Sequence, residues 1–234
     1  MAAVTEARLL AIWEAAVDRP PLTRALVLAA AGGADPGAVA DLSVGRRDGY
    51  LLALRENCFG ELYPSVVMCP RCGEELEVEL SAAEVHAASP GKDRGSVNAG
   101  GRGVEFRLIT SRDLDEITGR PDARRDLIQR CLTSVGGGDP VGALDDSALD
   151  AVSAAMAGLD PQAAVCVDLT CAACGHGWAA PFDVAGYLWD ELNAHAARIL
   201  GDVHALATVY GWSEAEVLAV SPARRRYYLE MAAP

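Results

Sequence analysis

The feature that most constrains the fold is a cysteine motif that occurs twice, far apart in the chain. Each copy is Cys-x-x-Cys-Gly, at residues 69–73 and 171–175, and about 98 residues separate the two. Two residues between thiols let one turn present both sulfurs to the same ion, and the glycine permits backbone amides to point at those sulfurs. Both copies have strand-like residues on each side, as a two-hairpin zinc ribbon requires. The sequence therefore predicts one tetrahedral structural Zn²⁺, held by Cys69, Cys72, Cys171 and Cys174.

The cysteine pairs also fit an iron centre, a redox-active dithiol, or two pairs that never meet, and the sequence leaves these alternatives open. Four protein ligands would leave no position for an activated water or a substrate, so the zinc interpretation favours a protein that is not an enzyme. His176 is an alternative ligand, although four cysteines are available. The remaining cysteines lie on apolar patterns and are predicted to be buried, unreactive thiols: Cys58, Cys131 and Cys166.

The composition narrows the function classes. The chain has 234 residues, of which 51% are hydrophobic and 23% charged, which is enough to bury a core. A net charge of -13 argues against binding to nucleic acid, because phosphate contacts need clustered Lys and Arg. An odd number of cysteines, seven, suits metal binding in a reducing compartment. With no signal-like start and no apolar run of membrane-spanning length, we expect a cytoplasmic protein without a membrane or small-molecule partner.

Hydrophobic periodicity divides the chain into three regions. Residues 1–60 show helical spacing and form an N-terminal helical region. Residues 61–183 contain the zinc ribbon, with strands alternating apolar and polar residues, a glycine-rich loop at 89–103, and a helical insertion at about 111–160. Residues 184–234 form a C-terminal helical region. The predicted fold is α+β: a split Cys₄ zinc ribbon with a small antiparallel sheet, flanked by N- and C-terminal helices and carrying the helical insertion.

The C-terminal region begins with a long predicted helix that ends at Gly211. Its nearly heptad-spaced apolar stripe packs either on the protein's own core or against a partner. His195 and His204 lie near this stripe and are predicted to be packed or edge side chains. Residues 213–216, Ser-Glu-Ala-Glu, have the pattern of a capping box, and Ser-Pro at 221–222 starts the last helix.

The densest positive charge is the run Arg224, Arg225 and Arg226, next to Tyr227 and Tyr228. Such a cluster can dock an acidic partner, with arginine and aromatic side chains as anchors. The alternative is a solvated helix face that contacts the protein's own carboxylates. Both interpretations stay open.

Several segments resemble a known family. The run from Asp202 to Leu229, a Cys-x-x-Cys-Gly turn followed by an acidic strand, and residues 106–114, Phe-Arg-Leu-Ile-Thr-Ser-Arg-Asp-Leu, are similar to baseplate hub assembly chaperones of T-even-like phages and phage-tail-like contractile injection systems. The resemblance implies a role in building or joining the baseplate and hub, with baseplate or hub subunits as partners and incorporation into a particle as one fate. The family-like positions are His204, Tyr210, Trp212, Glu216, Leu218, Arg224, Arg225 and Tyr228.

Together these observations predict a non-enzymatic assembly factor or structural adaptor with a structural zinc. The residues expected to bind a partner are Tyr210, Trp212, Arg224, Arg225, Arg226 and Tyr228. Two rival functions remain: a zinc-ribbon adaptor in transcription or RNA processing, for which the arginine run is the one basic candidate, and a cysteine-based redox enzyme.

Overall fold

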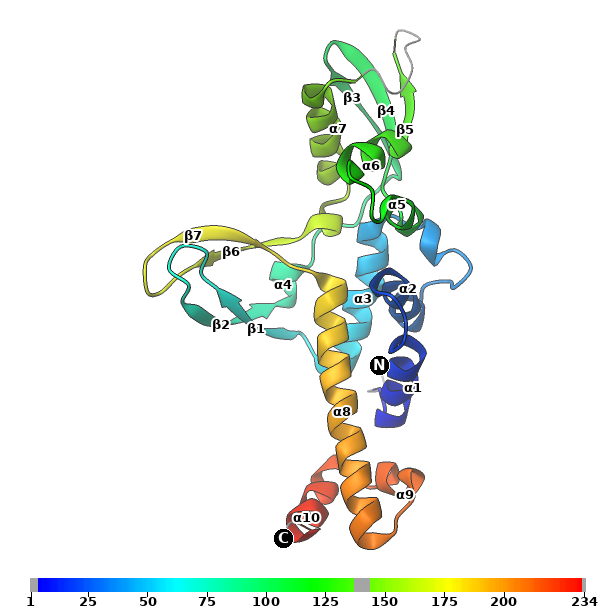
Figure 1. Cartoon of the computed structure of the whole chain (residues 1–234), viewed down its shortest axis with the longest axis vertical. Helices are drawn as coiled ribbons and strands as arrows, with labels where there is room; N and C mark the ends of the chain where they lie inside the picture. Colours follow the sequence, from blue (N-terminus) through cyan, green and yellow to red (C-terminus); the bar gives the residue numbers. More distant parts are fainter. Residues whose placement is uncertain (1–3, 137–143, 233–234) are drawn as a thin grey trace.

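The computed structural model describes residues 4–136 and 144–232 as a long helical body with a sideways arm made of two β-hairpins (Figure 1). The helices are α1 (Glu6–Ala16), α2 (Pro21–Ala31), α3 (Val44–Phe59), α4 (Ala82–Val85), α5 (Ser111–Ile117), α6 (Ala123–Cys131), α7 (Asp146–Leu159), α8 (Val184–Tyr210), α9 (Glu214–Ala219) and α10 (Pro222–Ala232), with 3-10 turns η1 (Val39–Asp41) and η3 (Pro161–Ala164). The strands are β1 (Leu62–Met68), β2 (Glu75–Ser81), β3 (Arg94–Ala99), β4 (Arg102–Arg107), β5 (Leu132–Val135), β6 (Cys166–Thr170) and β7 (Gly177–Pro181). Mixed helices and small antiparallel sheets confirm the predicted α+β class.

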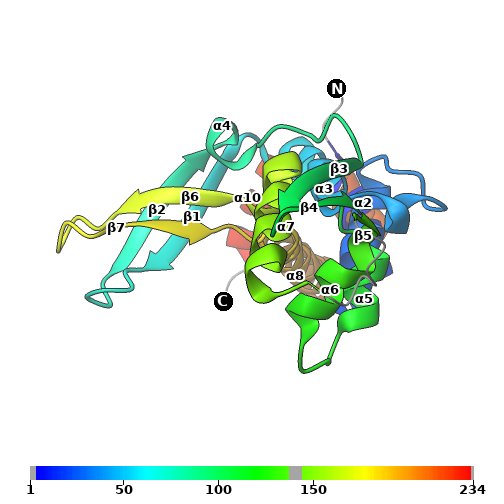
Figure 2. The ribbon, with the colours of Figure 1, turned by 90° about the horizontal axis from the view of Figure 1, so that it is seen from above.

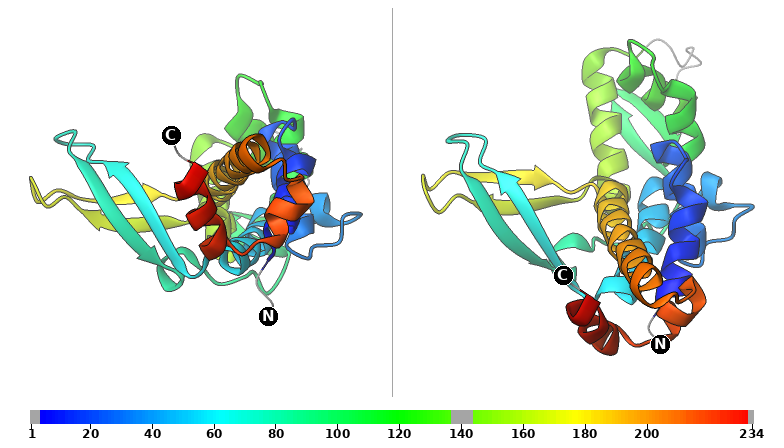
Figure 3. Two further views of the ribbon diagram at one scale, coloured as in Figure 1. Left: turned by 90° about the horizontal axis from the view of Figure 1, so that it is seen from below. Right: turned by 60° about the horizontal axis from the view of Figure 1, so that its bottom comes forward.

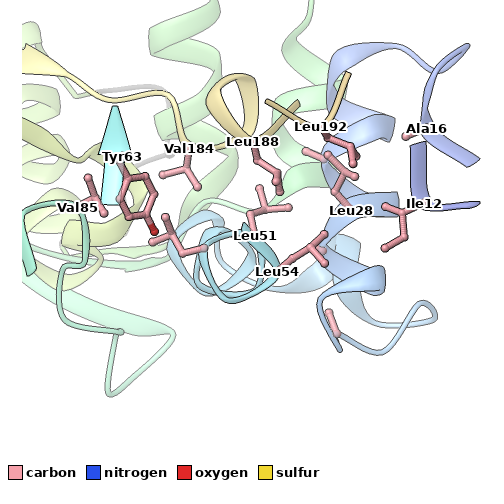
Figure 4. Packing of buried hydrophobic residues seen from close by; sticks show 14 of the residues in the cluster. Ile12, Ala16, Leu28, Leu51, Leu54, Tyr63, Val85, Val184, Leu188 and Leu192 are labelled. Atoms are coloured by element: carbon pink, nitrogen blue, oxygen red, sulfur yellow. The ribbon is translucent and has the colours of Figure 1, made fainter. Parts of the chain in front are cut away.

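The helical body is held together by one apolar cluster. Helices α1, α2 and α3 pack with the first half of α8, and the bases of both hairpins join the same cluster. Figure 4 shows Leu28, Leu51, Leu188 and Leu192 meeting between these helices. None of these four leucines is more than 1% exposed, so α8, which begins after residue 183, is fixed against the N-terminal helices.

The arm consists of two separate two-stranded sheets. Strand β1 pairs with β2, and β6 pairs with β7, each antiparallel. Figure 2 shows both hairpins projecting to the same side of the helical body. The inner sides of the two hairpins face each other, and there Val167 is buried and Val78 and Leu169 are half-buried. The alternate residues of the four strands face solvent. The two hairpins belong to different sheets and share no strand pairing. A different interaction must therefore join their tips.

A second lobe occupies the end of the molecule opposite α10 (Figure 1). Strands β3, β4 and β5 form an antiparallel sheet in that order, and α6 and α7 pack with it around a separate apolar cluster. Two predictions need correction here. The glycine-rich stretch 89–103 is not only a loop, because β3 lies within it, and the insertion at 111–160 is not only helical, because it contains β5. In both cases strand pairing with β4 outweighs weak local strand propensity.

The lobe is attached to the body by buried polar contacts. Arg47 on α3 donates from Nη1 to Oγ of Ser111 at 3.0 Å, and Nε donates to Oδ1 of Asp48 at 2.8 Å. The backbone N–H of Gly45 donates to Oδ2 of Asp160 at 3.0 Å, which joins α3 to the end of α7. Residues 136–140, Gly-Gly-Gly-Asp-Pro, have the composition of a flexible connection, and most of them fall in the segment 137–143, which lies outside the described residues.

The C-terminal helices α9 and α10 fold back around the far end of α8 (Figure 3). Gly211 ends α8 with a φ of 70°, and the capping box of Ser213 and Glu216 starts α9, as the sequence predicts. Among residues 4–136 and 144–232, no helix combines the length and the apolar character that crossing a membrane requires.

Candidate metal centre

Four cysteine side chains from two hairpin turns come together at the tip of the arm. Cys69 and Cys72 lie in the turn between β1 and β2, and Cys171 and Cys174 lie between β6 and β7. All four Sγ atoms lie within 4.8 Å of one another. The Sγ atoms of Cys69 and Cys174 are 3.8 Å apart, and those of Cys72 and Cys171 are 3.7 Å apart. The structure therefore brings together the four cysteines that the sequence predicts as metal ligands.

The two turns have the same backbone conformation. In the first, the N–H of Cys69 donates to the carbonyl of Glu74 at 2.8 Å. In the second, the N–H of Cys171 donates to the carbonyl of His176 at 2.9 Å. Gly73 and Gly175 have φ angles of 74° and 69°, a left-handed conformation that a glycine adopts without steric cost. Each motif therefore presents its two sulfurs in the same way, one motif facing the other.

These four side chains fit a single tetrahedral metal ion. Sulfurs at about 2.3 Å from one zinc ion, at the corners of a tetrahedron, lie about 3.8 Å from each other. Two of the four Sγ–Sγ distances between the hairpins, 3.8 and 3.7 Å, match this edge length, and every pair of sulfurs lies within 4.8 Å. All seven cysteines are free thiols. A set of four sulfurs suits a thiolate-binding metal, a class that includes zinc and iron.

The four thiols influence one another's ionisation. Burial alone would raise the pKa of Cys69, but the backbone N–H groups of Cys72 and Arg71 lower it to about 7. The backbone N–H of Glu74 lowers the pKa of Cys72, but burial and the three neighbouring thiols raise it to about 12. One thiolate therefore suppresses ionisation of the next. A bound divalent cation would relieve this repulsion, because it attracts every thiolate and offsets two of the four negative charges.

The remaining cysteines, together with His176, do not join the cluster. Burial raises the pKa of the Cys58 and Cys131 thiols, each to about 11, which keeps both protonated near neutral pH. Cys131 is buried as predicted, whereas Cys166 is exposed on the outer side of β6. The ring of His176 stacks on Trp178 instead of joining the cysteines.

A buried arginine anchors the base of the arm. Arg55 on α3 is 2% exposed; its Nε and Nη2 donate to the carboxylate of Glu191 on α8 at 2.7 and 2.9 Å. Its guanidinium lies 3.9 Å from the ring centre of Tyr63 on β1, and its Nη1 donates to the carbonyl of Gly60 at 2.7 Å. Tyr187 on α8 donates from its hydroxyl to the carbonyl of Pro64 at 2.8 Å. The sequence patterns gave no signal for this network, because its members come from two distant segments, residues 55–64 and 187–191.

The aromatic residues predicted to bind a partner form a cluster at the C-terminal end. The ring centres of Tyr210 and Trp212 are 5.2 Å apart and stacked, and Trp212 meets Tyr228 edge-on at 5.0 Å. Trp212 is half-buried, and 38% of Tyr210 is exposed. These residues therefore join the end of α8 to α10 and still present part of their surface to solvent.

The three arginines point in different directions. Arg225 is 2% exposed, and it pairs through Nη2 with Glu6 at 2.5 Å and through Nε with Asp202 at 3.1 Å. It holds α10 against α1 and α8 and does not face solvent. Arg224 and Arg226 are exposed.

Comparison with known proteins shows which family the chain belongs to. Residues 27–184 match the family described as T4 bacteriophage base plate protein, which is more than half of the chain. The protein belongs to this family. Neither the curated proteins nor the solved structures contain a match.

The extent of the match separates two parts of this baseplate family protein. All four clustered cysteines lie inside residues 27–184, together with α3, both hairpins and the second lobe. The aromatic cluster, α10 and its arginines lie beyond residue 184. The match therefore covers the cysteine cluster and does not reach the C-terminal surface.

Proposed function

We propose that this baseplate family protein is a non-enzymatic assembly factor or structural adaptor that helps to build the baseplate and hub of a phage tail or contractile injection system, with one structural Zn²⁺. The observation that carries the proposal is that the family match includes the four cysteines whose sulfurs lie within 4.8 Å of one another. Its partners are baseplate or hub subunits, and it acts in the cytoplasm during assembly or within the finished particle.

The chain's own residues define what the metal centre does. Cys69 and Cys72 would bind the ion from the tip of one hairpin, and Cys171 and Cys174 would bind it from the tip of the other. Zinc bound to four thiolates supplies folding energy and leaves no coordination position for a substrate. The buried Arg55 fixes the base of the arm on α3 and α8. The arm would therefore project as a rigid element and not as a mobile loop.

The C-terminal end is the proposed partner-binding surface. Tyr210, Trp212 and Tyr228 keep partly exposed rings, and Arg224 and Arg226 reach into solvent. Exposed aromatic and arginine side chains are the usual anchors of protein interfaces. Arg225 would contribute by positioning α10, since its side chain is used internally.

Family membership also weighs against the rivals. A family described by its baseplate protein fits an assembly role better than an adaptor for RNA or transcription. A redox enzyme would need thiols that react while the protein stays folded, whereas metal-bound thiolates react only after a chelator removes the ion. Thiol titration of the native protein, with and without chelator, distinguishes these two cases.

The proposal is tested by co-purification from cells that assemble the particle. The tagged protein should co-purify with identified tube, sheath or spike proteins, and deletion of residues 211–234 should abolish this. A milder variant, Arg224→Glu with Arg226→Glu, keeps the internal contacts of Arg225 and should weaken co-purification while the zinc content stays the same. Unchanged co-purification of both variants would refute the proposed surface.

A further inference from the structure

Exposed apolar side chains gather at two places that differ in charge. Among the described residues, nine large hydrophobic side chains are exposed. Three of them lie on β1, and four lie at the C-terminal end on α8 and α10. These seven are Leu62, Val66, Met68, Val209, Tyr210, Tyr227 and Met231.

The outer face of the first hairpin is half apolar and half acidic. Leu62, Val66 and Met68 are 53%, 62% and 59% exposed, and together with Pro64 they form one row along β1. The neighbouring row on β2 consists of glutamates, because the register sets Pro64, Val66 and Met68 opposite three exposed Glu residues. Those residues are Glu79, Glu77 and Glu75, in that order. The alternation of apolar and polar residues predicts only that one face of the hairpin meets solvent, whereas the structure shows on that face an apolar row on β1 beside the glutamate row on β2.

Helix α10 presents the complementary combination. Arg224, Tyr227 and Met231 follow one another at spacings of three and four residues, so they share one stripe of the helix. Tyr227 is 68% and Met231 67% exposed, and the side chain of Arg224 forms no ion pair with any described residue. Arg226 and Glu230, four residues apart, are both exposed and lie on the neighbouring stripe, which therefore carries both signs of charge. The buried Arg225 holds α10 so that this stripe faces outward.

We propose that the α10 stripe of one copy of this chain docks on the outer β1–β2 face of a second copy. Tyr227 and Met231 would cover the apolar row, and Arg224 would lie against the glutamate row. A second copy is the favoured occupant because one chain supplies both halves of the match: apolar with apolar, and positive with negative. The proposal builds on the proposed binding role of α10 and names a partner for it.

The positions of the two surfaces determine the kind of assembly. The β1–β2 hairpin extends sideways from the long axis, whereas α10 lies at one end of it (Figure 1). Each copy would therefore use one surface to bind the copy ahead and the other to bind the copy behind. Such a head-to-tail contact produces a ring when the rotation closes and an open chain when it does not.

The experiment is sedimentation velocity of the purified zinc-loaded protein over a range of concentrations. The wild-type protein should form species larger than a monomer, and more so at low salt. Glu77→Arg and Arg224→Glu should each weaken association about tenfold or more, because each puts like charges opposite one another. Glu105→Arg makes the same change of charge at an exposed position of β4, outside the proposed interface, and this variant should associate like wild type.

Charge exchange makes the test specific. A mixture of the Glu77→Arg and Arg224→Glu proteins should assemble, since each contact between the two kinds of copy again joins opposite charges. The protein carrying both substitutions should assemble by itself for the same reason. Circular dichroism and zinc content should be unchanged in every variant, which shows that folding is intact.

A wild-type protein that stays monomeric at every concentration would overturn the inference, as would assembly that both single variants leave unchanged. Failure of the mixture and of the double variant to assemble would overturn it as well. These results use the purified chain alone. Co-purification with tube, sheath or spike proteins therefore tests the proposed function separately, and it can hold where self-association fails.

Discussion

At the residue scale, a glycine sets how closely the second lobe approaches the helical body. A Cβ atom on Gly45 would lie 1.9 Å from Oδ1 of Asp160 and 2.9 Å from the backbone nitrogen of Ala163. These distances leave no room for any side chain. The close approach also permits the hydrogen bond from the N–H of Gly45 to Asp160, which helps to fix η3 on α3.

Gly45→Ala should therefore lower the free energy of unfolding by about 1 to 3 kcal/mol, because the added methyl displaces Asp160 and breaks its hydrogen bond. Urea denaturation measures the change. Gly49→Ala, on the same helix, is the matched control, since an added Cβ there meets nothing within 4 Å. It should be neutral or slightly stabilising. Equal destabilisation of both variants would contradict the role assigned to the contact.

A second residue-scale effect concerns Asp113 and pH. Burial alone would raise the pKa of this carboxyl, but the Arg107 guanidinium and the N–H and hydroxyl of Thr110 lower it well below its usual range. A carboxyl in the unfolded chain has a pKa of about 3.9. The stabilisation by Asp113 is therefore fully present above that pH and is lost as the pH falls toward the lower folded-state pKa.

Asp113→Asn should cost about 2 to 3 kcal/mol at neutral pH, because it leaves Arg107 without its carboxylate. The difference from wild type should shrink steadily below about pH 4. Denaturant titrations at several pH values measure it, with the exposed Asp115→Asn as the control. A difference that stays constant down to acid pH would show that the carboxylate charge is not what stabilises this site.

At the element scale, the sequence predicted the elements with strong local signals. The long helix ends at Gly211, and the capping box that begins at Ser213 is present. It missed β3 and β5, because Gly, Ser and Asn dominate one and a helical pattern runs into the other. Their strand conformation comes from pairing with β4. Only the tertiary structure supplies this information.

The attachment of α10 depends on one buried ion-paired arginine. Arg225→Ala removes the contacts with Glu6 on α1 and Asp202 on α8. The expected result is about 2 to 4 kcal/mol less stabilisation of α10, with faster hydrogen exchange in residues 222–232 and unchanged exchange in α3. Hydrogen exchange with mass spectrometry resolves these segments.

The neighbouring Arg226→Ala is the control for this prediction. Arg226 is exposed and makes no described ion pair, so its loss should leave the exchange of α10 close to wild type. Equal exchange in the two variants would mean that different contacts, such as the aromatic cluster of Tyr210, Trp212 and Tyr228, suffice to hold the helix.

At the scale of the whole molecule, different interactions stabilise the arm and the helical body. The body has a continuous apolar cluster, whereas the two hairpins belong to separate sheets and meet at their tips through four cysteines. The metal is thus expected to matter most for the arm. The helical core should stay folded without it.

Removal of the metal by a chelator should raise hydrogen exchange about a hundredfold in the hairpins β1–β2 and β6–β7 and leave α3 and α8 protected. Cys69→Ser should have the same effect without chelator. Cys166→Ser is the matched control, because Cys166 lies on β6, outside the cluster, and its thiol is exposed. Loss of protection throughout the chain would show that the metal supports the body as well.

The candidate site was easier to predict than its surroundings. Spacing within each motif and the flanking strand patterns identified Cys69, Cys72, Cys171 and Cys174, since metal chemistry limits the residues that can ligate. No comparable rule connects Arg55 to Glu191 or Arg225 to Glu6, because these pairs form only when distant helices pack. The inward direction of Arg225 therefore could not be found from its position in an arginine run.

Zinc coordination by the four cysteines is tested most directly by X-ray absorption at the zinc edge on protein purified without added metal. We expect one zinc per chain with four sulfur neighbours at about 2.3 Å, and loss of this zinc in Cys69→Ser and in Cys171→Ser. Absence of zinc, or a first shell with nitrogen or oxygen in place of a cysteine sulfur in the wild-type protein, would contradict it.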